Sequence, residues 1–140
     1  MPGNAPNGYE ALFEPFSICN VEIPNRVVFQ PHFTALGSAD GLPTDAHRAY
    51  HEARAAGGAG LIIFESMAVH PEGKMSHHFV DAWDPKVIEP FKEIVDAVGG
   101  VKVPFLYETR DKKTGLYIPG PSCFEFSGDH ALAYVRSRSG

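Results

Sequence analysis

Gly57-Gly58-Ala59-Gly60-Leu61-Ile62-Ile63-Phe64 is the stretch that decides the fold of this chain. Its paired glycines are typical of a helix end, and the apolar run from Gly60 to Phe64 is typical of a strand covered on both faces. Because polar residues do not alternate with apolar ones in the run, the sequence predicts a buried parallel strand here.

The sequence before this run predicts a helix and an earlier strand of the same type. Thr44 is a favourable N-cap and Asp45 places a carboxylate in the first turn, so a helix is predicted over residues 45–56. Arg26-Val27-Val28-Phe29-Gln30 is another apolar run without alternation, which predicts a second buried parallel strand. The predicted order is therefore strand, helix, strand.

Two more elements flank this unit. Phe16–Ile18 and Val21–Ile23 are short, closely spaced apolar runs, which is typical of a small hairpin. Residues 85–98 are predicted as a second helix, because Asp84 can cap it, Pro85 suits its first position and its apolar residues fall on one stripe.

This order predicts an α/β fold, and more narrowly a βαβα unit of the (β/α) barrel type. Parallel strands need a right-handed crossover between them, and in such sheets ligands bind beyond the carboxyl ends of the strands. We therefore expect functional residues after Gln30 and after Phe64.

Length and composition exclude several classes of protein. With 140 residues the chain has room for one domain and is well short of the ~250 residues of a complete (β/α)₈ barrel. A hydrophobic fraction of 44% and a net charge of -5 predict a globular protein that does not bind nucleic acid. No apolar run is long enough for a membrane segment, and the N-terminus lacks a signal pattern, so the chain is predicted to be cytoplasmic. Cys19 and Cys123 have no ligand spacing, so no metal site is predicted.

Five blocks, taken in order, are more specific than any one motif. They are Leu12-Phe13-Glu14-Pro15, Asn25-Arg26-Val27-Val28, Asp40-Gly41 with Pro43-Thr44, residues 55–65 and residues 68–73. Over residues 9–98 the chain thereby resembles the N-terminal quarter of the old yellow enzyme family of flavin-dependent NAD(P)H oxidoreductases, or ene reductases.

The resemblance implies a site as well as a fold. In this family a (β/α)₈ barrel holds FMN at the carboxyl ends of its strands and passes hydride from NAD(P)H through FMN to an activated alkene, a small-molecule substrate. By position in the family, the residues that would contact FMN are Pro31, His32, Phe33, Thr34, Ser66 and Ala68. The family commonly has Thr or Cys near Phe33 to tune the flavin, so Thr34 would have to take that role. The match ends before the family's other catalytic residues, and those of this chain stay unknown.

The histidines of these loops also have simpler interpretations. Without the family resemblance, a histidine such as His32 after a buried strand is more often a hydrogen-bonded loop residue than a catalyst. His70, His77 and His78 match no metal-ligand spacing and are predicted to be solvated loop residues.

After Gly99-Gly100 the pattern changes. The sequence continues with Val101-Lys102-Val103-Pro104, residues 110–116 (RDKKTGL) and residues 128–138 (GDHALAYVRSR). Over residues 91–138 the chain resembles the LytR-CpsA-Psr family of cell-wall phosphotransferases, which take glycopolymers from a polyprenyl-pyrophosphate carrier. That resemblance implies phosphate binding by Arg136, Arg138 and Arg110. A helix capped by Ser127 would also place the first two of these arginines at its C-terminal end, where the helix dipole favours cations without any ligand.

Together the resemblances predict a chimera of two partial domains, residues 1–98 and 99–140, which form one compact unit or fold incompletely. The predicted sheet is small and mostly parallel, with Val101–Val103 as a third parallel strand beside Gly60–Phe64 and weak strands at 117–118 and 123–126. Its exposed edge favours a homo-oligomer. Three functions stay open: an FMN-dependent oxidoreductase fragment, a polyprenyl-pyrophosphate-binding phosphotransferase fragment and an inactive fusion.

Overall fold

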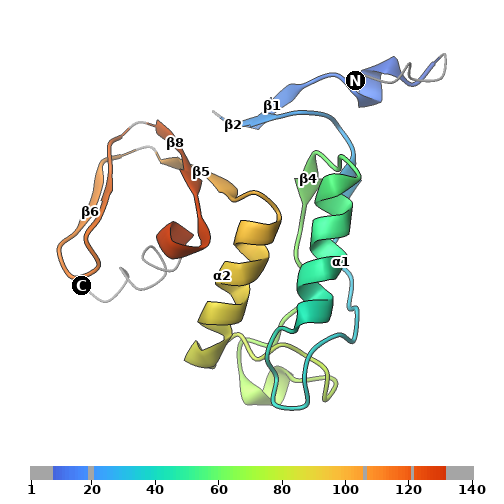
Figure 1. Cartoon of the computed structure of the whole chain (residues 1–140), viewed down its shortest axis with the longest axis vertical. Coiled ribbons are helices and arrows are strands. Elements are labelled where there is room, and N and C mark those ends of the chain that lie inside the picture. The colour runs from blue at the N-terminus through green and yellow to red at the C-terminus, as the bar shows by residue number, and fades with distance from the viewer. Residues whose placement is uncertain (1–7, 19–20, 106, 121, 132–140) are drawn as a thin grey trace.

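Two parallel strands joined through a helix form the N-terminal half of the molecule (Figure 1). The computed structural model describes residues 8–18, 21–105, 107–120 and 122–131. Within them the elements are η1 (Glu10–Leu12), β1 (Phe16–Ile18), β2 (Val21–Ile23), β3 (Val28–Phe29), α1 (Asp45–Ala56), β4 (Leu61–Ile62), η2 (Pro71–Gly73), η3 (Pro85–Val87), α2 (Ile88–Ala97), β5 (Val101–Phe105), β6 (Thr109–Asp111), β7 (Leu116–Ile118) and β8 (Ser122–Phe126), with η denoting a 3-10 helix.

The strand, helix, strand order is confirmed, and α1 has the predicted bounds. β3 and β4 pair in parallel, with Val28 opposite Leu61 and Phe29 opposite Ile62. Both strands are shorter than the predicted five residues, and they are half-buried instead of buried. The physical reason is that, in the described part of the chain, each strand has only one neighbouring strand to extend the ladder and cover it.

The hairpin and the second helix are also where the sequence predicts them. β1 and β2 pair antiparallel, and Val21 and Ile23 are buried. Asp84 accepts a hydrogen bond from the Lys86 amide at 2.9 Å and starts η3, which continues directly into α2. α1 and α2 lie side by side, and the ring of Phe91 on α2 meets that of Phe64 edge to face at 4.9 Å.

The predicted third parallel strand is wrong. β5 pairs antiparallel with β8, with Val101 opposite Phe126, and does not join β4. Gly99 and Gly100 have φ angles of 89° and 95°, in the left-handed region, and so permit the sharp turn between α2 and β5. The strand that β5 pairs with over all five residues is β8, a distant segment that the local sequence does not indicate. Among the described strand pairs, only β3–β4 is parallel, so the mostly parallel sheet is wrong too.

The C-terminal segment has a small apolar core of its own. Leu116, Ile118 and Phe126 form it, with Phe124 and Ala131 packed against it. The strands β7 and β8 that carry these residues include the two weak strands predicted at 117–118 and 123–126.

A short helix starts at Gly128 and docks on α2. The Gly128 amide donates to the Asp96 carboxylate at 2.7 Å, and Lys92 pairs with Asp129 at 2.6 Å. Ser127 caps this helix as predicted, because its hydroxyl accepts from the His130 amide at 3.4 Å. The helix is described as far as residue 131, so Arg136 and Arg138 lie outside the described residues.

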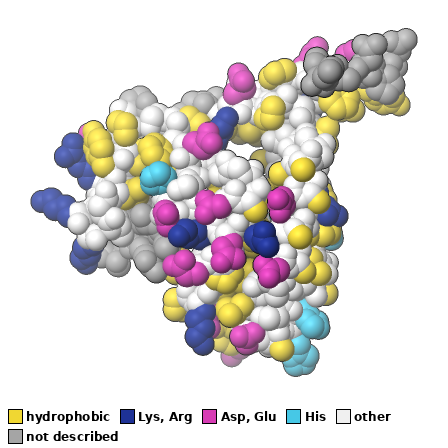
Figure 2. Space-filling view, viewed as in Figure 1, with side chains coloured by type: hydrophobic (Ala, Val, Ile, Leu, Met, Phe, Trp, Pro, Cys, Tyr) yellow, Lys and Arg dark blue, Asp and Glu magenta, His cyan; other side chains and the backbone are white. Residues whose placement is uncertain are grey.

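The surface over α1 and α2 is strongly charged. Figure 2 shows carboxylates interspersed with Lys and Arg side chains on this face. Glu93 and Asp96 of α2 are exposed. In the described ranges, no helix has the length and apolar character needed to cross a bilayer. Self-association through a sheet edge stays a prediction.

Candidate functional site

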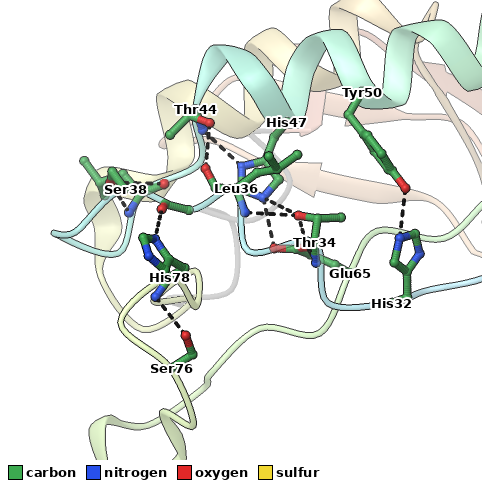
Figure 3. Close-up of polar contacts among 12 residues, drawn as sticks. His32, Thr34, Leu36, Ser38, Thr44, His47, Tyr50, Glu65, Ser76 and His78 are labelled. Carbon is green, nitrogen blue, oxygen red and sulfur yellow. Dashed lines mark hydrogen bonds and ion pairs between the residues drawn. The ribbon is translucent and has the colours of Figure 1, made fainter.

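The loops that follow β3 and β4 meet at a buried carboxylate (Figure 3). Glu65 directly follows the apolar run from Gly60 to Phe64 that contains β4, and its side chain is only 1% exposed. Its Oε2 accepts the Thr34 amide at 2.7 Å and also the Thr34 hydroxyl, and its Oε1 lies 2.9 Å from Nε2 of His47. Thr34 belongs to the first loop, Glu65 to the second and His47 to α1, so three segments are joined at one point.

The helix α1 delivers His47 to this point through its sequence spacing. His47 and His51 are four residues apart and so share one helix face, the face turned inward, where they are 0% and 2% exposed. The Thr44 amide donates to Nδ1 of His47 at 3.2 Å, and the Thr44 hydroxyl donates to the Leu36 carbonyl at 2.8 Å. The start of α1 therefore orients the imidazole and also holds the loop after β3.

His51 is buried without a hydrogen bond. Neither ring nitrogen has a partner among the described residues, and the ring lies against Phe64, with centroids 4.8 Å apart. Burial lowers the pKa of His51 below its ordinary value of 6.5, and the nearby His47 lowers it further. Of the other charged groups close to it, Glu65 raises this pKa, while Arg54 and His32 lower it.

The stability of the protein is expected to fall as the pH drops below about 6.5, the ordinary pKa of histidine. The unfolded chain protonates His51 at a higher pH than the folded chain does, so acid favours the unfolded state by at most about 1.4 kcal/mol per pH unit for this one proton. Urea unfolding between pH 8 and pH 5 measures the loss. The variant His51→Leu should show a shallower dependence, and an unchanged slope would contradict the assignment.

His32 is held from α1 through a tyrosine. The Tyr50 hydroxyl lies 2.8 Å from Nε2 of His32, and the guanidinium of Arg54 sits 3.3 Å from the centre of the Tyr50 ring. Arg54 also donates to the Tyr50 carbonyl at 2.9 Å, which fixes the cation over the ring. The interpretation of His32 as a hydrogen-bonded loop histidine is therefore confirmed, with its ring still exposed.

The remaining residues predicted to contact FMN divide between the surface and the interior. Pro31, Phe33 and Ser66 are exposed, and the ring of Phe33 leans on that of buried Phe79 at 4.7 Å. Ala68, in contrast, is 3% exposed, and its amide donates to the Val80 carbonyl at 3.0 Å. Both loops thus have exposed residues next to the buried tie, whereas Ala68 is buried.

Comparison with known proteins decides the family. A sequence model of the NADH:flavin oxidoreductase / NADH oxidase family matches residues 11–103, well over half of the chain. The chain belongs to the NADH:flavin oxidoreductase / NADH oxidase family. A curated relative, the NADPH dehydrogenase of Listeria monocytogenes serotype 4b (strain CLIP80459), is 34% identical over 88 residues, which are 62% of this chain and 26% of the relative. The chain therefore spans about a quarter of the length of such relatives.

Solved structures of the flavin oxidoreductase family share the fold of the same portion. The old yellow enzyme from Trypanosoma cruzi has 29% identity and a TM-score of 0.58, covering 64% of this chain and 24% of that one. Morphinone reductase in complex with tetrahydroNAD has 28% identity and a TM-score of 0.57, covering 63% and 23%. The resemblance of the N-terminal part to the old yellow enzyme family is confirmed.

The second resemblance stays a prediction. The match to the flavin oxidoreductase family ends at residue 103, shortly after the glycines at 99 and 100. Of the arginines predicted to bind phosphate, Arg110 is described, and it pairs with Glu108 at 2.7 Å while its guanidinium lies 4.5 Å from the centre of the Tyr117 ring. Arg110 therefore already forms an ion pair with a carboxylate of the same chain.

The sequence predicts correctly that two loops follow the parallel strands β3 and β4. It does not predict the side chains of α1 that support these loops. His47 and His51 were not among the predicted site residues, and Tyr50 was not either. The available signal was their position in the predicted helix, since residues four apart share a face and a histidine pair on an inward face is unusual. Which side of the helix faces inward depends on β3 and β4, and that required the structure.

Proposed function

We propose that this chain supplies the first wall of an FMN site in an NAD(P)H-dependent oxidoreductase. The observation that carries the proposal is the buried tie between Thr34 and Glu65, which fixes the two loops at the carboxyl ends of parallel strands. That edge is where ligands bind in parallel α/β folds. Because the chain spans about a quarter of its relatives' length, the complete reaction is part of this proposal.

The exposed residues of the two loops fit one face of an aromatic cofactor. Phe33 and Met67 are 39% and 37% exposed and offer apolar contact, while His32 and Ser66 offer polar groups beside them. FMN, when bound, supplies the redox centre that accepts hydride from NAD(P)H. The residues of this chain bind the ring, orient it and exclude water from its covered face.

Thr34 does not take the tuning role that the resemblance implied for it. Its hydroxyl donates to Glu65 and accepts from the Leu36 amide at 3.3 Å, so its one hydrogen is directed inward. A flavin beside this loop would receive hydrogen bonds from His32 or from backbone amides instead. Thr34 therefore contributes by holding its loop to Glu65 through its amide and hydroxyl, and not by donating its hydroxyl to the flavin.

The names of two relatives support NAD(P)H as the reductant. One is called an NADPH dehydrogenase, and morphinone reductase was solved with tetrahydroNAD. The substrate proposed with it is a small molecule with an activated alkene. The family's residues that would select this substrate lie outside the two loops described above.

The purified chain is expected to quench the fluorescence of added FMN in a saturable titration. The variant Phe33→Ser should weaken binding about tenfold, or about 1.4 kcal/mol, because it removes an apolar contact of the proposed wall. Tyr107→Ser is the matched control, since Tyr107 is an exposed aromatic residue of the C-terminal segment, 81% exposed, and its replacement should leave the dissociation constant unchanged. A titration of the unaltered chain without quenching would reject the proposed function.

A further inference from the structure

We propose that Glu65 is a positioning residue of the proposed FMN site, and that it acts as an ionised group which only accepts hydrogen bonds. The proposal rests on the proposed function for the identity of the ligand. Glu65 does not touch the exposed surface itself, because its side chain is 1% exposed. It sets the distance between the two loops that do.

The protonation of His47 follows from its partners. The Thr44 amide points at Nδ1, and a backbone amide can only donate, so Nδ1 carries a lone pair. The hydrogen of the neutral ring is then on Nε2, which donates to Oε1 of Glu65 at 2.9 Å. The contact is a neutral imidazole donating to a carboxylate.

Three donors therefore converge on one carboxylate. They are Nε2–H of His47, the amide of Thr34 and the hydroxyl of Thr34, whose oxygen is already an acceptor for Leu36. A carboxylate has only acceptor sites and satisfies all three. Glutamine of nearly the same shape has one acceptor and one amino group, so it would direct a donor at a donor where no solvent can intervene.

The position of this tie in the sequence links it to the proposed site. Thr34 follows Phe33 directly, and Glu65 precedes Ser66 directly. The tie therefore fixes the ring-bearing residue Phe33 of the first loop relative to the second loop. The other hydrogen bonds that the structure gives between the two loops are made at Gly37 and Gly41. Beside the contact of the Phe33 ring with Phe79, the tie at Glu65 therefore holds Phe33 against the second loop.

The first experiment uses the chain without ligand and three variants: Glu65→Gln, Thr34→Val and Thr34→Ser. In the unaltered chain, ¹⁵N chemical shifts should show His47 as the Nε2–H tautomer. Glu65→Gln should abolish this signature and raise amide exchange at Thr34 at least tenfold, while the Ile94 amide in α2 stays unchanged and reports an intact fold. Equal exchange at Thr34 in both proteins, or the Nδ1–H tautomer in the unaltered chain, would overturn the proposal.

The second experiment measures FMN binding by fluorescence with the same variants. Thr34→Ser keeps the hydroxyl and the amide and should bind as the unaltered chain does, within about twofold, whereas Thr34→Val and Glu65→Gln should each bind about tenfold more weakly. The double variant should be no weaker than either one, because both break the same tie. Faster exchange in Glu65→Gln with unchanged FMN affinity would overturn the positioning role.

Failure of the proposed function can be told apart from failure of this inference. If the unaltered chain does not bind FMN, the proposed function is rejected by the titration alone. The tautomer and exchange measurements need no ligand, so they decide separately whether Glu65 holds the two loops together.

Discussion

Replacing His47 by leucine is expected to lower the free energy of unfolding by about 2–4 kcal/mol, a large part of the stability of a domain of this size. Leucine is close to histidine in volume, so the cavity term is small and the lost hydrogen bonds dominate. The change leaves the buried Oε1 of Glu65 without its donor and the part-buried Thr44 amide without its acceptor. Denaturation in urea, followed by circular dichroism, measures the difference.

His51 is the matched control for this prediction. It lies one turn further along the same inward face of α1, is nearly as buried as His47, and its ring nitrogens make no hydrogen bond among the described residues. Replacing it by leucine removes an unsatisfied polar group from an apolar site and should change the free energy of unfolding by less than about 1 kcal/mol. Equal losses at the two positions would show that burial, and not hydrogen bonding, decides both.

The second large effect is expected for Gly128→Ala. On a helix this change would normally stabilise by about 0.5–1 kcal/mol. Here the added Cβ would lie 2.5 Å from the Lys92 carbonyl oxygen and 2.9 Å from the Asp96 carboxylate, neither of which can give way without moving α2 or breaking the 2.7 Å bond from the Gly128 amide. We expect a net loss of about 1–3 kcal/mol, as in other overpacked sites.

Amide hydrogen exchange locates the effect of Gly128→Ala. The Ala131 amide, which donates to the Ser127 carbonyl, should exchange faster, whereas amides of α1 should not change. Gly73→Ala is the control, because a Cβ at Gly73 meets nothing within 4 Å. If exchange quickens throughout the chain, the two segments unfold together and the contact on α2 is part of one cooperative unit.

The elements were predictable where local signals agree with their surroundings. The helix over residues 45–56 has a cap, a first-turn carboxylate and a glycine end, and each signal is local. The path after Gly100 was not predictable in the same way. A pair of glycines predicts a turn but not the direction that the chain takes after it. The strand that pairs with β5 is β8, about twenty residues further along the chain.

The site was predictable in part for a related reason. Family resemblance placed Pro31, His32, Phe33 and Ser66 on two loops that do meet, and all four residues are exposed. It could not show that the Thr34 hydroxyl points inward, because that depends on Glu65, which is thirty-one residues away. A carboxylate at the end of an apolar run is more often solvated than buried, so the sequence alone gave no reason to place it in the interior.

The length of chain between two paired strands also determines the order in which the pairs form during folding. β6 and β7 are joined by the four residues 112–115, so their ladder closes over a very short loop. β3 and β4 are separated by residues 30–60, which include α1, and closing this longer loop is slower because it costs more chain entropy. During refolding, the C-terminal hairpin should therefore form before the two loops that carry the proposed flavin site come together.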